Sequence, residues 1–395
     1  MTINNEHKKL NVPNLRFPEF EGEWKESTIG EMFDLYSGNT PSRLNKEHFK
    51  GTVNWISSGE LKEHYIYSSK EQISEEAAKS LKLLPVGTFV IAIYGLEADG
   101  VRGTGSITQE PSTISQACMS FIPKGVIENE FLYSWYKKHG NVIGIRYAQG
   151  TKQQNLSYDI LEKFRIAYPN TKEQEELNKF ISLLDERIAT QNKIIEDLKK
   201  LKCAIIEKLY AEVKGTKYSY RQLFNIINER NKQLEYSNVL SASQEKGMVS
   251  RDDLNLDIQF ERSNINTYKI VKNGDYVIHL RSFQGGFAFS EKTGVCSPAY
   301  TILRPNGLLV YGYLSYYFTS REFIQSLIIV TYGIRDGRSI NVDEWLDMKV
   351  VIPSKEQQSH IVNVIKSIEN KIKNEETYSN CLLKQKQYLL RQMFI

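Results

Sequence analysis

Two stretches of the chain repeat the hydrophobic pattern of a long helix. After Pro169 and again after Pro353, apolar residues recur every seven positions in two rows that start four residues apart. Each stretch continues for about 35 residues without glycine or proline, which is typical of a coiled coil and longer than most globular helices. The pattern therefore predicts two long helices that pair antiparallel. The predicted core positions are Leu177, Ile181, Leu184, Ile188, Ile195, Leu198, Ile205, Leu209, Ile361, Ile365, Ile368, Ile372, Leu382 and Leu389.

The two helical stretches are related by a constant offset. Pro169 and Pro353 are 353 − 169 = 184 residues apart, and the same offset relates Lys202 to Lys386, which interrupt the apolar rows. Polar residues at core positions fix the register of a coiled coil at some cost in stability. Aligning the shared letters Lys-Glu-Gln after each proline requires a one-residue slip, which we interpret as a small insertion. The alternative is that each stretch is a core helix of a larger domain.

The segments that precede the two helices match each other in the same order. Each half contains a glycine turn with a strand, a second strand, an aromatic-rich helix, and a basic loop that leads through a short helix into a last strand. The matched ranges are 83–93 with 268–280, 114–123 with 295–305, 129–138 with 311–320, and 150–169 with 336–353. The sequence therefore predicts an α+β fold of two tandem α/β globules, each followed by a long helix, with an internal pseudo-two-fold repeat.

This repeat predicts four segments along the chain. They are a first globule over 1–169, a helix over 170–213, a second globule over 214–353 and a helix over 354–395. The first helix leaves one globule and arrives at the next, and the second helix must run back beside it. We therefore expect the globules at opposite ends of the helical pair.

Composition places the chain among soluble globular proteins. It has 395 residues, of which 41% are hydrophobic and 25% charged, and its net charge of +4 permits a nucleic-acid surface without requiring one. The four cysteines are scattered, without a Cys-x-x-Cys pair, which predicts reduced thiols. The polar start lacks the apolar core of a signal peptide. We expect a cytoplasmic protein.

Catalytic motifs are incomplete in this sequence. The glycine spacing of Gly95–Arg102 lacks the Lys-Ser/Thr that grips phosphate in a P-loop. Ser297–Tyr300 resembles a motif of adenine methyltransferases, but Ala299 replaces its second proline, and no glycine-rich cofactor loop accompanies it. We expect a turn that orients Tyr300 for packing. The sequence therefore predicts no catalytic residue, no metal ligand and no cofactor on this chain.

Polar and basic loops recur at equivalent places in both halves. Their Arg, Lys, Gln, Asn and Ser side chains are those that contact base edges or phosphates of DNA. A solvated loop is the simpler interpretation of any single residue, but recurrence of the whole set favours DNA contact. The candidates in the first half are Ser57, Ser58, Lys62, Arg102, Thr104, Lys152, Gln153, Gln154 and Asn155, and those in the second are Ser243, Gln244, Lys246, Arg281, Ser282, Gln284, Arg335, Arg338 and Ser339.

The chain resembles the specificity (S) subunit of type I restriction–modification systems. The resemblance rests on "VPNLRFPEFEGEW" (Val12–Trp24), on the strand–Pro–KEQ–heptad junction that occurs twice, and on "IVKNGDYVIHL" and "GVCSPAYTI" in the second half. It implies two target-recognition domains, each reading one part of a bipartite asymmetric DNA sequence across a spacer. It also implies a non-catalytic chain whose helices dock two modification subunits, which bind S-adenosylmethionine and methylate adenine. Restriction subunits, ATP-dependent translocases and nucleases that use Mg²⁺, join that core.

The resemblance also bears on the length of the helices. About 38 helical residues rise roughly 57 Å, which equals about 17 base pairs of B-DNA. The helical pair is therefore expected to set the spacer between the two half-sites. The other functions that the sequence leaves open are a coiled-coil adaptor that holds two protein-binding domains apart, an enzyme with degenerate motifs, and the specificity subunit of a split-site type II enzyme.

Overall fold

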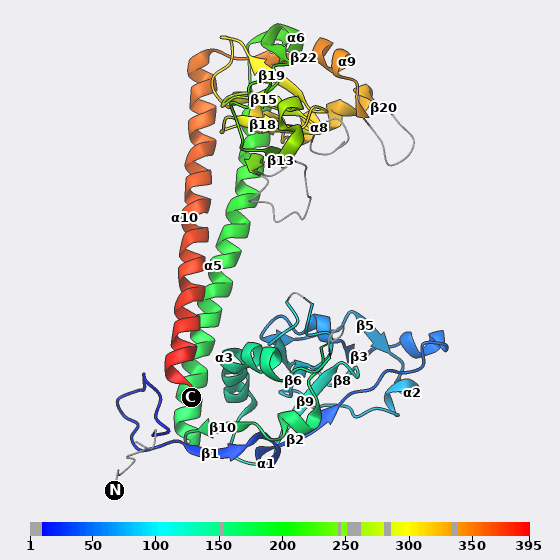
Figure 1. The fold of residues 1–395 in the computed structure, drawn as a ribbon, viewed down its shortest axis with the longest axis vertical. Coiled ribbons are helices and arrows are strands. Elements are labelled where there is room, and N and C mark those ends of the chain that lie inside the picture. Colours follow the sequence, from blue (N-terminus) through cyan, green and yellow to red (C-terminus); the bar gives the residue numbers. More distant parts are fainter. Residues whose placement is uncertain are drawn as a thin grey trace. The chain divides into compact units, whose positions relative to one another are not determined.

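The computed structural model describes residues 10–98, 100–150, 154–243, 246–250, 262–279, 286–332 and 339–395. It separates into two compact units. The first unit contains residues 1–191 and 378–395, and the second contains residues 192–377. Each unit therefore combines one globule with a segment of each long helix (Figure 1).

The first unit is built on a five-stranded sheet in the order β2-β9-β6-β7-β4. All neighbours are antiparallel except β4, which runs parallel to β7. Every residue of β6 is buried, because this central strand is covered on both faces. The strands are β2 (Phe33–Ser37), β9 (Cys118–Pro123), β6 (Phe89–Ala92), β7 (Gly105–Thr108) and β4 (Tyr65–Ile66).

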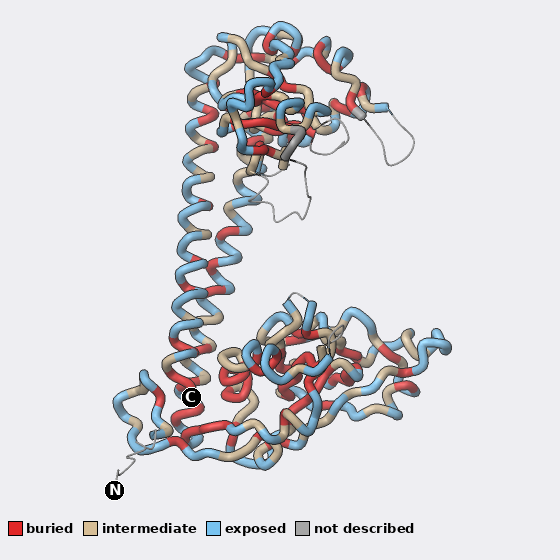
Figure 2. Tube along the Cα trace, in the orientation of Figure 1, coloured by how far each residue is buried: buried red, intermediate tan, exposed pale blue. Residues whose placement is uncertain are grey.

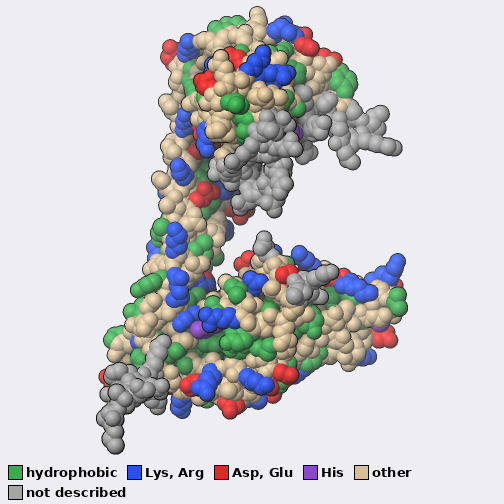
Figure 3. Space-filling model, in the orientation of Figure 1, with side chains coloured by type: hydrophobic (Ala, Val, Ile, Leu, Met, Phe, Trp, Pro, Cys, Tyr) green, Lys and Arg blue, Asp and Glu red, His purple; other side chains and the backbone are tan. Residues whose placement is uncertain are grey.

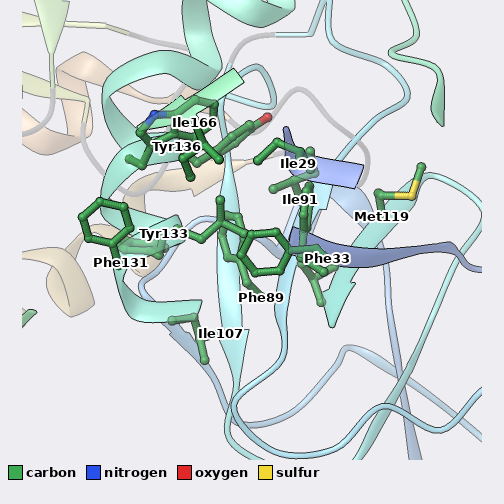
Figure 4. Close-up of a cluster of buried hydrophobic side chains, with 14 of the residues drawn as sticks. Ile29, Phe33, Phe89, Ile91, Ile107, Met119, Phe131, Tyr133, Tyr136 and Ile166 are labelled. Atoms are coloured by element: carbon green, nitrogen blue, oxygen red, sulfur yellow. The ribbon is translucent and has the colours of Figure 1, made fainter. Parts of the chain in front are cut away.

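The aromatic-rich helix α3 (Asn129–Tyr147) packs against this sheet. The ring centroids of Tyr133 and Tyr136 lie 6.0 Å and 5.7 Å from that of Phe89 in β6. Figure 4 shows these side chains in one cluster with Phe131. The core of the first globule is therefore an aromatic layer between helix and sheet, as the composition of 129–138 predicts.

Smaller elements complete the first unit. β1 pairs with β10, and β3 pairs antiparallel with β5 and parallel with β8. These elements are β1 (Lys25–Thr28), α1 (Ile29–Met32), η1 (Lys46–Phe49), β3 (Val53–Ile56), η2 (Ser58–Glu60), β5 (Glu71–Ile73), α2 (Glu75–Ala78), β8 (Ser112–Ile114), α4 (Tyr158–Leu161) and β10 (Arg165–Tyr168).

The second unit repeats the same strand order. Its four-stranded sheet has the order β12-β19-β16-β17, which corresponds strand for strand to β2-β9-β6-β7, and β11 pairs with β22 as β1 pairs with β10. The internal repeat predicted from the sequence is confirmed. The strands are β11 (Thr216–Ser219), β12 (Phe224–Ile227), β13 (Leu240–Ser243), β14 (Gly247–Ser250), β15 (Lys269–Val271), β16 (Tyr276–Ile278), β17 (Phe287–Phe289), β18 (Gly294–Cys296), β19 (Thr301–Pro305), β20 (Thr331–Tyr332), β21 (Ser339–Ile340) and β22 (Lys349–Ile352).

The helical part of the second globule differs from the first. The aromatic-rich helix predicted within 311–320 is present as the shorter α7 (Tyr313–Tyr317), and a separate helix, α8 (Arg321–Ser326), follows it. The Ser320 hydroxyl accepts the N–H of Phe323 at 3.2 Å, and such a cap favours a helix start at this point. The remaining helical elements are α6 (Tyr220–Leu223), η4 (Arg262–Thr267), η5 (Leu327–Val330) and α9 (Val342–Asp347).

Both predicted long helices are present. They are α5 (Thr171–Ala211) and α10 (Lys355–Met393). All fourteen predicted core positions are buried or half-buried, and Figure 2 shows buried positions recurring along each helix. Near the end of α5 the most buried positions are Ile206 and Tyr210, one residue beyond the predicted row, because these two side chains belong to the core of the second globule.

The lysines that interrupt the apolar rows fix the helix register. Lys386 of α10 pairs with Asp185 of α5 in the first unit, and Lys202 of α5 pairs with Glu369 of α10 at 3.1 Å in the second. The 184-residue offset relates Lys202 to Lys386 and Asp185 to Glu369, so the lysine is on α5 in one pair and on α10 in the other. The helices are therefore antiparallel, and each of these two lysines forms an ion pair across the helices.

A buried glutamine joins each globule to the helix that follows it. Gln174 accepts the N–H of Glu128 and donates to the carbonyls of Val126 and Pro169 at 3.0 and 3.1 Å. Gln358, 184 residues later, makes the corresponding three hydrogen bonds, which are to the N–H of Val310 and the carbonyls of Leu308 and Pro353. The prediction of a one-residue slip is therefore wrong. The second glutamine of "KEQQ", and not the first, is the equivalent of Gln174.

The opening "LRFPEFEGEW" segment packs on the start of α5. Arg16 forms two hydrogen bonds with the buried carboxylate of Glu173, at 2.7 and 2.8 Å. The indole Nε1 of Trp24 donates to the same carboxylate at 3.1 Å. This interaction explains why an arginine and a tryptophan stand at this spacing before the first globule. Without Arg16 and Trp24, the carboxylate of Glu173 would be a buried charge without a partner, which is strongly destabilising.

Candidate nucleic-acid interface

Two of the predicted loops in the first globule lie in contact. Nη2 of Arg102 donates to Oε1 of Gln154 at 2.8 Å. The backbone N–H of Gln154 in turn donates to Oε2 of Glu97 at 2.7 Å. Arg102 also packs over α3, where a Cβ at Gly144 would lie 2.6 Å from its Cγ. The hairpin between β6 and β7 and the segment before α4 therefore present one surface.

Glu97 is a member of this cluster that the sequence analysis did not select. The backbone N–H groups of Gln154 and of Glu97 itself keep the pKa of this carboxylate below its ordinary value, and the charge of Arg102 adds to the effect. Glu97 is thus an anion beside the predicted contact residue. The sequence could have indicated Glu97 through its place between the glycines of 95–102, because glycines let the backbone approach neighbouring side chains closely.

Two buried polar atoms of the cluster have no hydrogen-bond partner among the described residues. They are Nε of Arg102 and Oδ1 of Asn155. The backbone of Asn155 is fixed by two hydrogen bonds with Gln149, at 2.8 and 2.9 Å. Lys152 and Gln153, also predicted contacts, lie outside the described residues.

The remaining candidates of the first globule support turns. Ser57 donates both its N–H and its hydroxyl to Oε2 of Glu60, at 2.9 and 2.6 Å. The hydroxyl of Thr104 donates to the carbonyl of Val101 at 2.6 Å. Ser58 is half-buried, and Lys62 is exposed. Of these residues, Lys62 offers a charge to solvent, whereas Ser57 and Thr104 shape the loops around it.

The turn over 57–62 is held against the same sheet as Arg102. The hydroxyl of Ser106 donates to the carbonyl of Glu63 at 2.5 Å, and the N–H of Ile107 donates to the carbonyl of His64 at 2.8 Å. Both acceptors follow the turn directly, and both donors belong to β7, which begins just after Thr104. The three candidate loops of the first globule therefore adjoin the β6–β7 hairpin.

In the second globule the serine-rich segment forms a different structure. Ser243 ends β13 and accepts the N–H of Lys246 at 3.3 Å, so the segment turns back as a β13–β14 hairpin. The conformation of this segment therefore differs from that of the turn over 57–62. Its place in the fold is the same, because each segment follows a residue that pairs in parallel with another strand: Ile56 with Ile114, and Val239 with Val295. Lys246 is exposed.

Most other candidates of the second globule lie outside the described residues. These are Gln244, Arg281, Ser282, Gln284, Arg335 and Arg338. The backbone of Ser339 belongs to β21, which pairs with β20. Contact of these seven candidates with DNA stays a prediction.

A polar hollow in the second globule was not predicted. It has a volume of about 600 Å³ and is lined by residues of 228–235 and by Ile270. Asn231, which is buried, fixes this segment by donating to the carbonyl of Tyr236 at 2.7 Å and accepting its N–H at 3.2 Å. Arg230 and Lys232 are exposed on it. Figure 3 shows that such basic side chains are distributed among acidic and hydrophobic ones on both units.

The incomplete catalytic motif is a turn. The N–H of Tyr300 donates to the carbonyl of Ser297 at 3.1 Å, and the Tyr300 carbonyl accepts from Lys269 at 2.8 Å. The prediction of a turn over Ser297–Tyr300 is confirmed. Across the described ranges, no group of three or more His, Cys, Asp or Glu side chains is arranged to hold a metal ion. Within the same ranges, every helix is too short or too polar to cross a membrane.

Comparison with known proteins identifies relatives of the chain. Residues 21–200 match the family of the type I restriction modification DNA specificity domain. The EcoR124I/EcoR124II type I restriction enzyme specificity subunit of Escherichia coli is 31% identical over 219 residues, which are 54% of this chain and 52% of that protein. The MjaIX specificity subunit of Methanocaldococcus jannaschii is 27% identical over 196 residues, which are 48% and 44% of the two chains. The chain thus spans about half the length of these relatives.

Solved structures extend the likeness of fold to nearly the whole chain. A crystal structure of the type I restriction–modification S subunit from M. genitalium matches with a TM-score of 0.52 at 15% identity, covering 97% of this chain and 99% of that one. A structure described for the assembly and conformational transition of the type I system matches with a TM-score of 0.61 at 13% identity, covering 94% and 97%. The chain is therefore similar to type I restriction–modification specificity subunits: its residues 21–200 match the model of their DNA specificity domain, and its fold resembles theirs.

Proposed function

We propose that the chain is the non-catalytic DNA-recognition subunit of a type I restriction–modification complex. Each globule reads one part of a bipartite asymmetric DNA sequence. The observation that carries this proposal is the duplication. The globule that contains the match to a DNA specificity domain is repeated in residues 192–377 with the same strand order, while the candidate contact loops differ. Two related readers with different loops suit a target of two different half-sites.

The proposed partners are double-stranded DNA, two modification subunits and restriction subunits. S-adenosylmethionine, ATP and Mg²⁺ belong to the partner subunits in this proposal, and no cofactor is assigned to this chain. The helices offer an apolar surface for docking, because large apolar side chains are exposed outside their core rows. These side chains are Leu183, Ile194 and Leu201 of α5 and Tyr378, Leu383 and Tyr388 of α10. In the first unit, Leu183 and Tyr378 line a hollow of about 450 Å³.

The purified chain alone should transfer no methyl group to DNA. The proposal places the chemistry on the modification subunits, and the chain should confer methylation of one bipartite sequence when it is combined with them. The measurement is incorporation of label from S-adenosylmethionine into mixed-sequence DNA, with and without the partners. Methyl transfer by the chain alone above background would contradict the proposal. Absence of salt-dependent DNA retention by the chain would instead favour a protein-binding adaptor, since phosphate contacts make DNA binding steeply salt-dependent.

Arg102→Ala should relax recognition of the first half-site and leave the second unchanged. Loss of a base contact typically costs about 1–3 kcal/mol at one position, whereas loss of a phosphate contact weakens all sequences alike. The measurement is a binding selection on DNA with each half-site randomised in turn. Lys246→Ala in the second globule is the matched control and should alter the second half-site only. If either variant perturbed both halves equally, the assignment of one globule to each half-site would be wrong.

A further inference from the structure

His64 lies where the first globule meets the two long helices, within the first unit. Its Nε2 is 2.8 Å from Oε2 of Glu130 on α3, and its Nδ1 is 3.4 Å from Oδ2 of Asp185 on α5. The other oxygen of Asp185 pairs with Lys386 of α10. The His64 side chain is only 13% exposed. One imidazole ring therefore connects the globule to the ion pair that sets the helix register.

Two tyrosine rings enclose the imidazole. The ring of Tyr65 stacks on it with a centroid distance of 4.0 Å and an interplanar angle of 10°. The ring of Tyr133 stacks on it at 3.9 Å and 6°. The faces of aromatic rings carry partial negative charge and attract a cation that lies over them. The stack holds the ring plane and so directs both nitrogens at the carboxylates.

The two carboxylates on either side of the ring favour its protonated form. A neutral imidazole has one N–H, so one of the two carboxylates would face a lone pair, whereas an imidazolium donates from both nitrogens. Burial opposes the charge, but the contacts with Asp185 and Glu130 outweigh it and raise the pKa of His64.

The charged groups around the ring favour the same state. On its own segment lies Glu63, α3 contributes Glu130 and Lys137, α5 contributes Asp185, and α10 contributes Lys386. Burial lowers the pKa of Lys137, and the nearby Lys386 lowers it further. The neighbourhood of His64 thus contains three carboxylates and two lysines, and the lowered pKa of Lys137 makes this lysine easier to deprotonate.

The second unit contains the same helix ion pair without a histidine. Glu369 is the equivalent of Asp185 at an offset of 184 residues, and Lys202 is the equivalent of Lys386. The group that the second globule presents to this carboxylate is the phenol of Tyr316, whose hydroxyl donates to Oε2 of Glu369 at 2.8 Å. Burial, with the help of Glu369, raises the pKa of Tyr316, so its proton stays in place. We call the His64 contact with Asp185 and the Tyr316 contact with Glu369 the first and the second joint. The first joint loses its proton as the pH rises through the raised pKa of His64, whereas the second keeps its proton.

The backbone of His64 also leads to the candidate DNA surface. It follows the turn over 57–62, and its carbonyl accepts the N–H of Ile107 in β7, the strand that begins after Arg102 and Thr104. A shift of His64 would therefore move both candidate loops relative to the helices of the first unit.

We propose that His64 is a positioning residue. As an imidazolium between Glu130 and Asp185 it fixes the first globule on its helix segments, so that reading of the first half-site weakens as the ring loses its proton, while reading of the second does not. This inference rests on the proposed function. Its pH range follows from the direction of the change. A group whose pKa is raised by folding stabilises the folded state fully below its unfolded value, which is about 6.5 for histidine, and loses that effect as the pH rises through the raised value. Burial alone would raise the pKa of Asp185, but its contacts with His64 and Lys386 lower it. Asp185 therefore stays ionised throughout this range.

The first test is a titration of the histidine rings of the full chain by NMR, with His64→Gln identifying the His64 resonance. We expect that resonance to titrate above the ordinary histidine value of about 6.5, with chemical shifts of Tyr65 and Tyr133 changing over the same range. Titration at or below that value would overturn the inference, whatever the chain does with DNA.

The second test measures half-site reading by the chain assembled with its modification subunits. The probes are the bipartite duplex that the wild-type assembly selects from a random library and the same duplex with one half-site scrambled. Raising the pH from about 6 to about 8.5 should reduce the penalty for scrambling the first half-site roughly tenfold and leave that for the second unchanged. Only the first joint loses the attraction between the imidazolium and the carboxylates of Glu130 and Asp185.

Two variants separate positioning from general stability. His64→Phe keeps the aromatic stack without a proton and should show the reduced first-site penalty at every pH. Tyr316→Phe, the matched change in the second joint, should reduce the second-site penalty equally at every pH. A first-site penalty in His64→Phe that still changes with pH, or an unchanged penalty in the wild type, would overturn the inference. A wild-type assembly that selects no bipartite duplex would overturn the proposed function instead.

Discussion

Gln358→Met should destabilise the second unit by about 3 kcal/mol, because three backbone groups that bond to the buried side chain of Gln358 lose their partner while the side-chain volume is kept. These groups are the N–H of Val310 and the carbonyls of Leu308 and Pro353. Gln174→Met should destabilise the first unit in the same way. The measurement is hydrogen exchange of the backbone amides at increasing urea concentration, which reports each unit separately. The loss of protection should stay within the unit that carries the substitution.

The neighbouring residue provides a matched control. Gln357 has the same side chain one position earlier and is exposed. Gln357→Met should change the stability of the second unit by less than about 0.5 kcal/mol, as for most surface substitutions. Equal effects of the two variants would show that the three hydrogen bonds of Gln358 do not hold the helix to the globule.

The distinction between these two glutamines shows where sequence reasoning reached its limit. The heptad rows and the 184-residue offset are periodic signals, and both were predicted correctly because a helix repeats its buried face at fixed spacing. The letters Lys-Glu-Gln gave the wrong alignment, because a shared tripeptide carries no information about which glutamine faces the globule. The hydrogen-bond pattern at Gln174 and Gln358 resolves it.

Contacts between distant segments were the harder part of the candidate site. Arg102 and Gln154 were both predicted from loop composition, but Glu97, which accepts the backbone N–H of Gln154, was not. His64 was likewise passed over, because its partners Glu130 and Asp185 are on other elements far along the chain. Local spacing predicts which face of an element is buried, whereas the pairing of polar groups across elements depends on the tertiary packing.

Lengthening both long helices should lengthen the gap between the two half-sites and leave their sequences unchanged. The ion pair Lys202–Glu369 places Ile194 of α5 level with Thr377 of α10 in the second unit. Four residues inserted after Lys193 and four after Thr377 therefore extend both helices at one level. The added rise is about 6 Å, or close to two base pairs of B-DNA. An insertion of four residues keeps the apolar rows nearly in phase, with local unwinding of the coiled coil.

The measurement is methylome sequencing of cells that carry the lengthened chain with its modification subunits. We expect the same two half-sites with a gap longer by one or two base pairs, since the unwinding also turns one end of the pair relative to the other. A variant with Lys193→Ala and Thr377→Ala and no insertion controls for disturbance of the local side-chain contacts and should keep the original gap. An active lengthened chain with an unchanged gap would show that the helices do not set the spacing. Altered half-site sequences would show that the globules are not the readers, because an insertion in the helices leaves every candidate contact loop unchanged.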